Sequence, residues 1–184
     1  MKIKHLSDWE KSLAPIIEDM GGRPLRIHAL LANHPALLQA LWPLRMYLVN
    51  GGDLTRRHCE LVILRTAAHM ENWYEWASHV VRGLDSGLSA DEIENVRDPA
   101  GNWSEADAVL LTAVDELMDG NVINPATLER LAPHFTDQQV LDVMHLKGMY
   151  TTIGCAIDTW GLELDEHVAA RLPDAPAAKD FQRD

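Results

Sequence analysis

Three polar side chains of one expected helix share a single face. Asn72, Glu75 and His79 are spaced at i, i+3 and i+7, and at roughly 100° per residue they fall within about a 60° arc of an α-helix. A carboxylate beside an imidazole in a partly apolar cleft perturbs both pKa values and can form an acid–base pair. The neighbouring Trp73, Tyr74 and Trp76 would keep water out of that cleft. The spacing therefore indicates proton-transfer chemistry at Glu75 and His79.

The same residues also fit two other arrangements. Glu75 and His79 are four residues apart, which suits an ordinary contact along a helix at a subunit seam. Glu71, Glu75 and His79 stand at i, i+4 and i+8, which suggests a metal site. Three ligands on one helix cannot complete a tetrahedral site alone, and the sequence has neither an HExxH motif nor a paired-cysteine motif. We therefore expect no metal or other cofactor, beyond adventitious binding at these three residues.

A second carboxylate, Glu60, lies in a nearly all-apolar helix that is expected to start near Thr55. Glu60 shares a stripe of that helix with Leu64 and Ala67. Because an unpaired carboxylate is costly among apolar neighbours, Glu60 must have a partner. One hypothesis is a structural ion pair with a nearby arginine, namely Arg56, Arg57 or Arg65. The other places Glu60 in a shared hollow with the acid–base pair of the next helix.

Composition limits the class of protein. The chain has 184 residues, of which 47% are hydrophobic and 24% charged, the balance of one globular domain. Its formal charge of −12 argues against nucleic acid and anionic membranes as partners. Cys59 and Cys155 lie too far apart in the sequence to form a CxxC pair. The early charged residues after Met1 do not resemble a signal peptide, and the uncharged stretch 27–44 contains prolines and histidines, so we expect a cytoplasmic protein without a membrane span.

Helix signals recur along the chain, whereas strand signals are missing. Apolar residues recur at helical spacing, and no run alternates with the period of two that is typical of strands. These patterns predict an all-α protein of about eight to ten helices. We expect a single domain over 1–172 with its core motif at 50–97, and a flexible tail at 173–184. The clearest helix starts are capping-box pairs: Ser7 with Glu10, Ser89 with Glu92, and Thr136 with Gln139.

The window from Thr55 to Gly87 resembles the carboxymuconolactone decarboxylase superfamily, which includes the AhpD-like alkylhydroperoxidases. The resemblance rests on the buried helix with Glu60 and on the stretch Trp73-Tyr74-Glu75-Trp76-Ala77-Ser78-His79. It implies an AhpD-like helical subunit that assembles into trimers or hexamers, with sites near subunit interfaces. It also implies that Glu60 and His79 occupy the positions of that superfamily's proton relay.

The chain departs from the redox branch of this superfamily at two positions. Where the AhpD-like branch has Cys-x-x-Cys-x-x-x-His, this sequence has Asn72 and Glu75 in place of the cysteines. The redox cycle of that branch needs one thiolate to attack and a second to resolve. The stretch from Trp73 to His79 instead resembles the Trp-x-Glu-aromatic-Ala-x-His pattern of the decarboxylase branch.

Residues and resemblance together predict a cofactor-free lyase that decarboxylates a small carboxylated lactone or a ring-cleavage acid of aromatic-compound catabolism. Loss of CO2 leaves a carbanion, so the site must stabilise an enolate and donate a proton to carbon. His79 is the expected proton donor, with Glu75 and Glu60 setting its protonation state. One arginine would clamp a substrate carboxylate bidentately. The expected substrate-binding residues are Asn72, Trp73, Trp76, Arg56, Arg57 and Arg65.

Three other functions remain open from the sequence. An isomerase or hydratase would use the same residues to move protons without releasing CO2. A thiol peroxidase would need Cys59 or Cys155 to act alone or to meet in space. A non-catalytic helical binding protein would keep Glu60, Glu75 and His79 as a buried polar network that fixes the register of its helices.

Overall fold

The computed structural model describes residues 1–98, 101–173 and Phe181, and this part of the chain is helical and contains no strand. The predicted all-α class is therefore confirmed. Short 3-10 turns lie at Leu6–Asp8 (η1) and Lys11–Leu13 (η2), and a π-helical turn lies at Tyr47–Gly51 (η3). The α-helices are α1 (Ala14–Asp19), α2 (Arg26–Leu31), α3 (Pro35–Met46), α4 (Arg56–His69), α5 (Trp73–Asp85), α6 (Ala90–Asn95), α7 (Glu105–Gly120), α8 (Pro125–Leu131), α9 (Asp137–Trp160) and α10 (Glu166–Ala169).

Two of the three predicted capping boxes are present. Ser89 and Glu92 begin α6, and Thr136 and Gln139 begin α9, each pair exchanging both side chain–backbone hydrogen bonds. The box predicted at Ser7 is wrong. Ser7 lies inside the turn Leu6–Asp8, and Glu10 has an extended backbone, so its side chain does not reach back to cap a helix.

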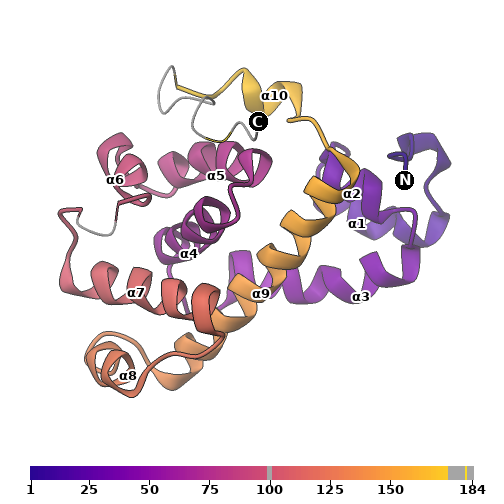
Figure 1. Ribbon diagram of the computed structural model, residues 1–184. Helices are drawn as coiled ribbons and strands as arrows, with labels where there is room; N and C mark the ends of the chain where they lie inside the picture. The colour runs from indigo at the N-terminus through magenta and orange to yellow at the C-terminus, as the bar shows by residue number, and fades with distance from the viewer. Residues whose placement is uncertain (99–100, 174–180, 182–184) are drawn as a thin grey trace.

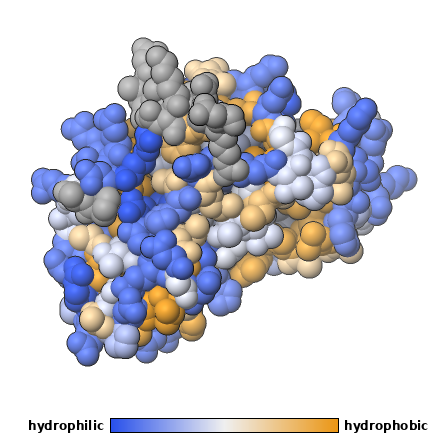
Figure 2. Space-filling model, in the orientation of Figure 1, coloured by the Kyte–Doolittle hydropathy of each residue, from blue (hydrophilic) through white to orange (hydrophobic). Residues whose placement is uncertain are grey.

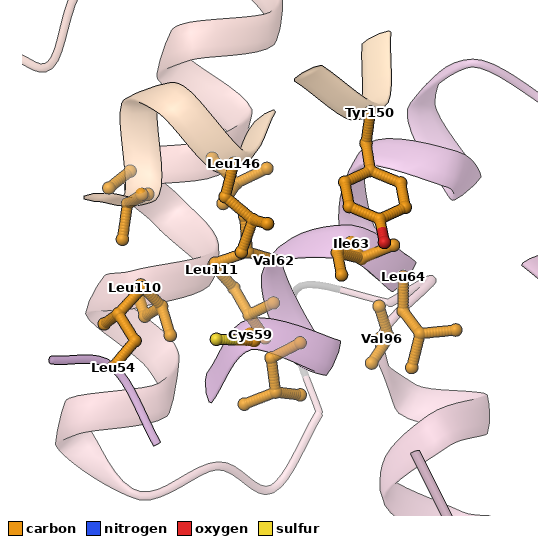
Figure 3. Packing of buried hydrophobic residues seen from close by; sticks show 14 of the residues in the cluster. Leu54, Cys59, Val62, Ile63, Leu64, Val96, Leu110, Leu111, Leu146 and Tyr150 are labelled. Carbon is orange, nitrogen blue, oxygen red and sulfur yellow. The ribbon is translucent and has the colours of Figure 1, made fainter. Parts of the chain in front are cut away.

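Helix α4 lies at the centre of the main core and packs against α5, α7 and α9 (Figure 1). Every residue from Cys59 to Ala67 is buried, as the apolar sequence of this segment predicts. Figure 3 shows Val62, Ile63 and Leu64 of α4 among side chains of the neighbouring helices. Each such side chain stabilises the fold by roughly 1.5–3 kcal/mol through burial. A polar residue of α4 is therefore held rigidly.

The segment from η1 through α3 forms a second, smaller core beside the main one (Figure 1). Trp9, Leu13, Leu38 and Trp42 are buried there. Helix α2 also packs against α9, and Ile27 and Leu30 contact Tyr74 of α5 and Ile157 of α9. This N-terminal arm therefore covers the part of α5 on which Glu75 and His79 lie.

An apolar groove of about 740 Å³ lies between the N-terminal arm and α9. Figure 2 shows pale and orange side chains gathered over α3 and α9. Leu37, Leu44 and Trp160 line the groove and are each at least 40% exposed. Within the described residues, no helix combines the length and apolarity needed to span a bilayer. The tail predicted at 173–184 lies outside the described residues except for Pro173 and Phe181.

Candidate functional site

The three predicted catalytic side chains converge in the interior. The Oε2 atom of Glu60 on α4 lies 2.6 Å from Nδ1 of His79 on α5. The other ring nitrogen, Nε2, lies 3.4 Å from Oε2 of Glu75. His79 is 0% exposed, Glu75 5% and Glu60 6%. One buried imidazole therefore has a carboxylate beside each of its nitrogens.

Asn72 positions this cluster by capping α5. Its Oδ1 accepts a hydrogen bond from the backbone N–H of Glu75 at 2.8 Å. Its Nδ2 donates to the carbonyl of Gly154 and to Oδ1 of Asp158, at 3.2 and 2.8 Å, both on α9. The side chain thus ties the first turn of α5 to α9, and it gives the free N–H of Glu75 a partner. Asn72 was expected to bind substrate, but its amide is already engaged in these contacts.

We expect Asn72→Ala to lower the free energy of unfolding by about 2 kcal/mol, because it removes a helix cap and the two hydrogen bonds from Asn72 to α9. Urea denaturation measures this loss. The matched control is Thr136→Ala, which removes an exposed cap from α9 and should cost about 1 kcal/mol. Equal losses in the two variants would contradict the tie between α5 and α9.

Three further residues surround His79 that the sequence analysis missed. Nη1 of Arg82 lies 3.0 Å from Nε2 of His79. The ring of Tyr150 on α9 meets the imidazole edge-on, with centroids 4.9 Å apart. Arg45 on α3 places its guanidinium over the Trp42 ring, 5.1 Å from the centroid. Arg82 follows His79 by three residues and lies on the same helix face, so helical spacing alone could have predicted it. Arg45 and Tyr150 are far from the motif in sequence, and no local pattern indicates them.

The surroundings of His79 support both protonation states of its ring. Burial lowers the pKa of His79, but the Glu60 carboxylate and the hydrogen bonds with Glu60 and Glu75 outweigh it, and the pKa is raised above its usual value. The charge of Arg82 opposes this rise. The Arg82 contact requires an Nε2 without a proton, while the Glu75 contact requires a protonated one. Such a balance is what general acid–base catalysis near neutral pH needs.

A cavity of about 20 Å³ lies against the cluster, enough for about one water molecule. His28, Ser78, His79 and Tyr150 are among its lining residues. The Oγ of Ser78 is buried and has no hydrogen-bond partner among the described residues. Burial, followed by the charges of two arginines, lowers the pKa of His28 to about 3. His28 is therefore neutral, and its Nδ1 accepts from the backbone N–H of Leu25.

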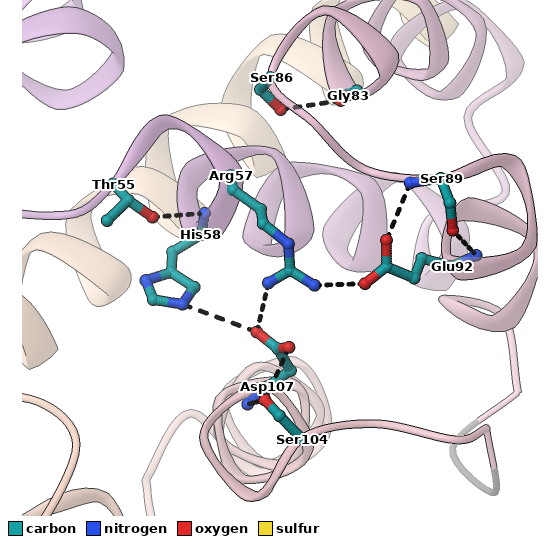
Figure 4. A network of polar contacts seen from close by, with 9 residues as sticks. All are labelled: Thr55, Arg57, His58, Gly83, Ser86, Ser89, Glu92, Ser104 and Asp107. Atoms are coloured by element: carbon teal, nitrogen blue, oxygen red, sulfur yellow. Dashed lines mark hydrogen bonds and ion pairs between the residues drawn. The ribbon is translucent and has the colours of Figure 1, made fainter.

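The structure does not bring Arg57 and Arg65 to this cluster. Arg57 pairs with Asp107 of α7 and Glu92 of α6, at 2.7 and 2.5 Å (Figure 4). Arg65 pairs bidentately with Asp115 and donates to the Val96 carbonyl. Both guanidiniums are therefore engaged with residues of α7 and of α6, including its C-cap residue Val96.

The partner of Glu60 is therefore His79, and the hypothesis of an ion pair with one of the nearby arginines is wrong. Arg56, in the first turn of α4, donates to Oδ1 of Asn50 at 2.8 Å. Of the three arginines proposed as substrate clamps, Arg56 alone lines a space that also borders Glu60.

Trp73 and Trp76 do not form the wall of the cavity. Trp76 stacks on Phe181 with centroids 5.2 Å apart, and Trp73 lies 6.0 Å from the same ring. Neither tryptophan is among the residues that line the cavity. The aromatic residues that line the cavity are Trp42, Tyr74 and Tyr150.

Neither a metal cluster nor an activated thiol lies at the site. No group of three or more metal-ligating side chains is found among the described residues. Glu71 precedes the start of α5 and is exposed, so it does not continue the helical line of Glu75 and His79. Cys59 is buried and donates to the Leu48 carbonyl, and burial, together with nearby carboxylates, raises the pKa of its thiol to about 12. Cys155 is exposed on α9.

Comparison with known proteins confirms the resemblance noted from the sequence. Residues 35–115, which run from α3 into α7, match the Carboxymuconolactone decarboxylase family. The matched segment contains Glu60, Glu75, His79, Arg45 and Arg82. No curated protein matches the chain in sequence.

Several solved structures share the fold. One is an alkylhydroperoxidase AhpD core from Ralstonia eutropha JMP134, an uncharacterized peroxidase-related protein, with a TM-score of 0.81 and 17% identity over 95% of this chain and 97% of that one. A peroxidase-related protein from Silicibacter sp. TM1040 gives 0.76 and 14%, over 85% of each chain. A Cys→Ala variant of the debrominase Bmp8 in complex with 2,3,4-tribromopyrrole gives 0.78 and 10%, over 98% and 96%. The TM-scores show that the chain has an AhpD-like fold, and the low sequence identities carry no information on its activity.

Proposed function

We propose that the protein is a cofactor-free acid–base enzyme that decarboxylates a small carboxylated lactone or ring-cleavage acid, because residues 35–115 match the carboxymuconolactone decarboxylase family. The observation that carries the proposal is the buried cluster in which His79 lies between Glu60 and Glu75. The superfamily's thiol positions hold Asn72 and Glu75, so the cluster offers proton transfer in place of thiol chemistry.

The proposed step breaks the bond between the substrate carbon and its departing carboxylate. The electron pair moves into the conjugated lactone carbonyl as CO2 leaves, which gives an enolate. Nε2–H of His79 then donates its proton to carbon, while Glu60 accepts a hydrogen bond from Nδ1–H and stabilises the imidazolium. Water returns the proton to His79. Proton transfer by a positioned side chain contributes about 10²–10⁴-fold to rate.

Incubation with carboxymuconolactone tests the reaction. We expect CO2 and the enol-lactone to appear together, in equal amounts, without added metal, reductant or peroxide. A panel of related carboxylated lactones covers variation in the ring substituents. No turnover of any member by the wild-type protein would reject the decarboxylase.

A second candidate is an isomerase or hydratase acting on an unsaturated acid at the same site. The balance of Arg82 and Glu75 at Nε2 of His79 favours it, because proton abstraction and proton return both need an imidazole that changes state easily. Deuterium exchange from solvent into the substrate without CO2 release would identify this activity.

We expect the double variant Cys59→Ser, Cys155→Ser to retain the wild-type rate of CO2 release, because neither thiol lines the cavity and Cys59 is held protonated by burial. Neither protein should consume hydrogen peroxide or an alkyl hydroperoxide. A peroxide assay and a CO2 assay on the same samples measure both. Peroxide consumption that is lost in the double variant would establish a thiol peroxidase instead.

We also propose that the subunits form a homo-oligomer, a trimer or a hexamer. The match of residues 35–115 to the family supports this assembly. The large apolar groove between the N-terminal arm and α9 also supports it, because monomeric proteins rarely expose large apolar patches. Light scattering during size-exclusion chromatography measures the subunit number.

A further inference from the structure

A hollow of about 210 Å³ adjoins the buried cluster and contains three arginines. Arg45, Arg56 and Arg82 line it, together with Asn50, Glu60 and Asp85. Arg45 and Arg82 also line the small cavity around His79. Their side chains therefore lie between the hollow and the imidazole, and a molecule that reaches His79 from the hollow must pass them.

The carboxylates that line this hollow form no ion pair with its three arginines. The chain as a whole carries −12, with only 16 lysines and arginines. The two carboxylates of the hollow are bound elsewhere: Glu60 to His79 at 2.6 Å, and Asp85 to Arg171 at 2.9 and 3.0 Å. Neither Arg45 nor Arg82 forms an ion pair with any residue that the structure describes. Two guanidiniums thus face one space in an acidic protein without a carboxylate partner.

The closeness of the two guanidiniums makes this arrangement unfavourable on its own. Burial lowers the pKa of Arg45, and the charge of Arg82 lowers it further, against the opposing effects of Tyr150, Glu75 and Glu60. An anion between the two arginines would relieve their repulsion and would satisfy planar donors that suit a carboxylate.

We propose that Arg45 and Arg82 bind the carboxylate that the substrate keeps throughout the reaction. This inference rests on the proposed function above. A carboxylate held by arginine is stabilised in the ground state and is a poor one to lose as CO2. The departing carboxylate must therefore be a second one, placed nearer to Nε2 of His79. Arg56 and Asn50 lie at the edge of the same hollow and add donors there.

Binding at Arg82 also changes the state of the acid–base cluster. Arg82 now contacts Nε2 of His79 at 3.0 Å, so a carboxylate that draws the guanidinium away leaves Nε2 facing Glu75 alone. The groups around the imidazole are then Glu60 of α4, Glu75 of α5 and Tyr150 of α9, with the neutral His28 of α2 and Arg45 of α3 behind them. This set favours the imidazolium, so substrate binding should be accompanied by proton uptake.

Calorimetric titration with cis,cis-muconate, a dicarboxylate that carries no lactone to cleave, tests the site. We expect Arg45→Gln and Arg82→Gln each to raise Kd at least about tenfold, which is 1.4 kcal/mol, and muconate dimethyl ester to bind the wild type at least as poorly. Arg130→Gln is the matched control, since Arg130 is exposed on α8 and paired with Glu105, and it should bind like the wild type. The melting temperature of each variant checks its fold.

The same titration in buffers of different ionisation enthalpy measures proton uptake. We expect uptake in the wild type and in Arg130→Gln, and its loss in Arg82→Gln. Equal affinity for muconate and its diester, wild-type affinity in both arginine variants, or uptake unchanged by Arg82→Gln would overturn the proposal.

The two proposals fail in different ways. Muconate binding through Arg45 and Arg82, with no CO2 released from any carboxylated lactone, would reject the decarboxylase and support this site. CO2 release with wild-type KM in both arginine variants would reject this site and support the decarboxylase.

Discussion

Replacement of His79 by Gln is expected to lower kcat for CO2 release by about 10²–10⁴-fold, because it removes the proton donor of the reaction. KM should change little, since binding of the retained carboxylate is assigned to Arg45 and Arg82. Steady-state CO2 release measures both constants. The variant keeps an amide in place of the buried ring, but it does not reproduce both ring nitrogens.

His79→Asn provides the matched comparison. The Asn amide can still donate toward Glu60, where Nδ1 of the ring now lies, but it has no atom at the position of Nε2. Both variants should therefore lose activity, while His79→Asn should retain more stability in urea. A kcat within tenfold of the wild type in a folded His79 variant would exclude His79 as the proton donor.

Replacement of Glu60 by Gln is expected to lower the free energy of unfolding by about 2 kcal/mol at pH 6, because a charged hydrogen bond to His79 is lost. The pKa of His79 is raised in the folded state. The stability that this contributes is fully present below the unfolded pKa of about 6.5 and is lost as the pH rises through the raised folded value. The difference between wild type and Glu60→Gln should therefore shrink from pH 6 to pH 9.

Urea denaturation at pH 6 and pH 9 measures this difference. Glu75→Gln is the comparator, and it should show a smaller pH dependence because Glu75 lies 3.4 Å from Nε2 whereas Glu60 lies 2.6 Å from Nδ1. A loss in Glu60→Gln that is the same at both pH values would contradict the assigned charge state of the pair. Large losses in Glu75→Gln and His79→Gln, with no substrate found, would favour the non-catalytic scaffold.

Local features of the sequence were sufficient to predict the helices. Ser89 and Thr136 begin α6 and α9 because their hydroxyls and the Glu92 and Gln139 side chains satisfy the free amides of a first turn, which needs no tertiary contact. Ser7 and Glu10 have the same spacing as a capping box, so the same local rule wrongly predicted a helix start there. A capping pair also requires the following residues to adopt helical backbone, and Trp9 and Glu10 do not.

The sequence predicted only the part of the candidate site that lies on a single helix. Helical geometry places Glu75 and His79 on one face of α5, and the family resemblance indicated Glu60 as the third member. The choice between His79 and an arginine as the partner of Glu60 depends on how α4 packs against α5, which no local pattern records. Arg57 and Arg65 likewise face α6 and α7 because of packing.

Two residues beside the imidazole could not be predicted from the sequence. Arg45 comes from α3 and Tyr150 from α9, both far from the motif in sequence. Only the folding of the N-terminal arm and α9 against α5 brings these side chains to His79. Trp73 and Trp76 show the converse, because they adjoin Glu75 in sequence but pack against Phe181 and do not line the cavity.

The most direct measurement of the central claim follows CO2 and deuterium together while carboxymuconolactone is turned over in D2O. The account predicts that wild-type protein releases CO2 and places one solvent deuterium on the carbon that lost it, and that His79→Gln does both about 10²–10⁴-fold more slowly. Absence of both CO2 and deuterium incorporation with the wild type, or both at close to the wild-type rate in His79→Gln, would contradict acid–base catalysis at this buried cluster.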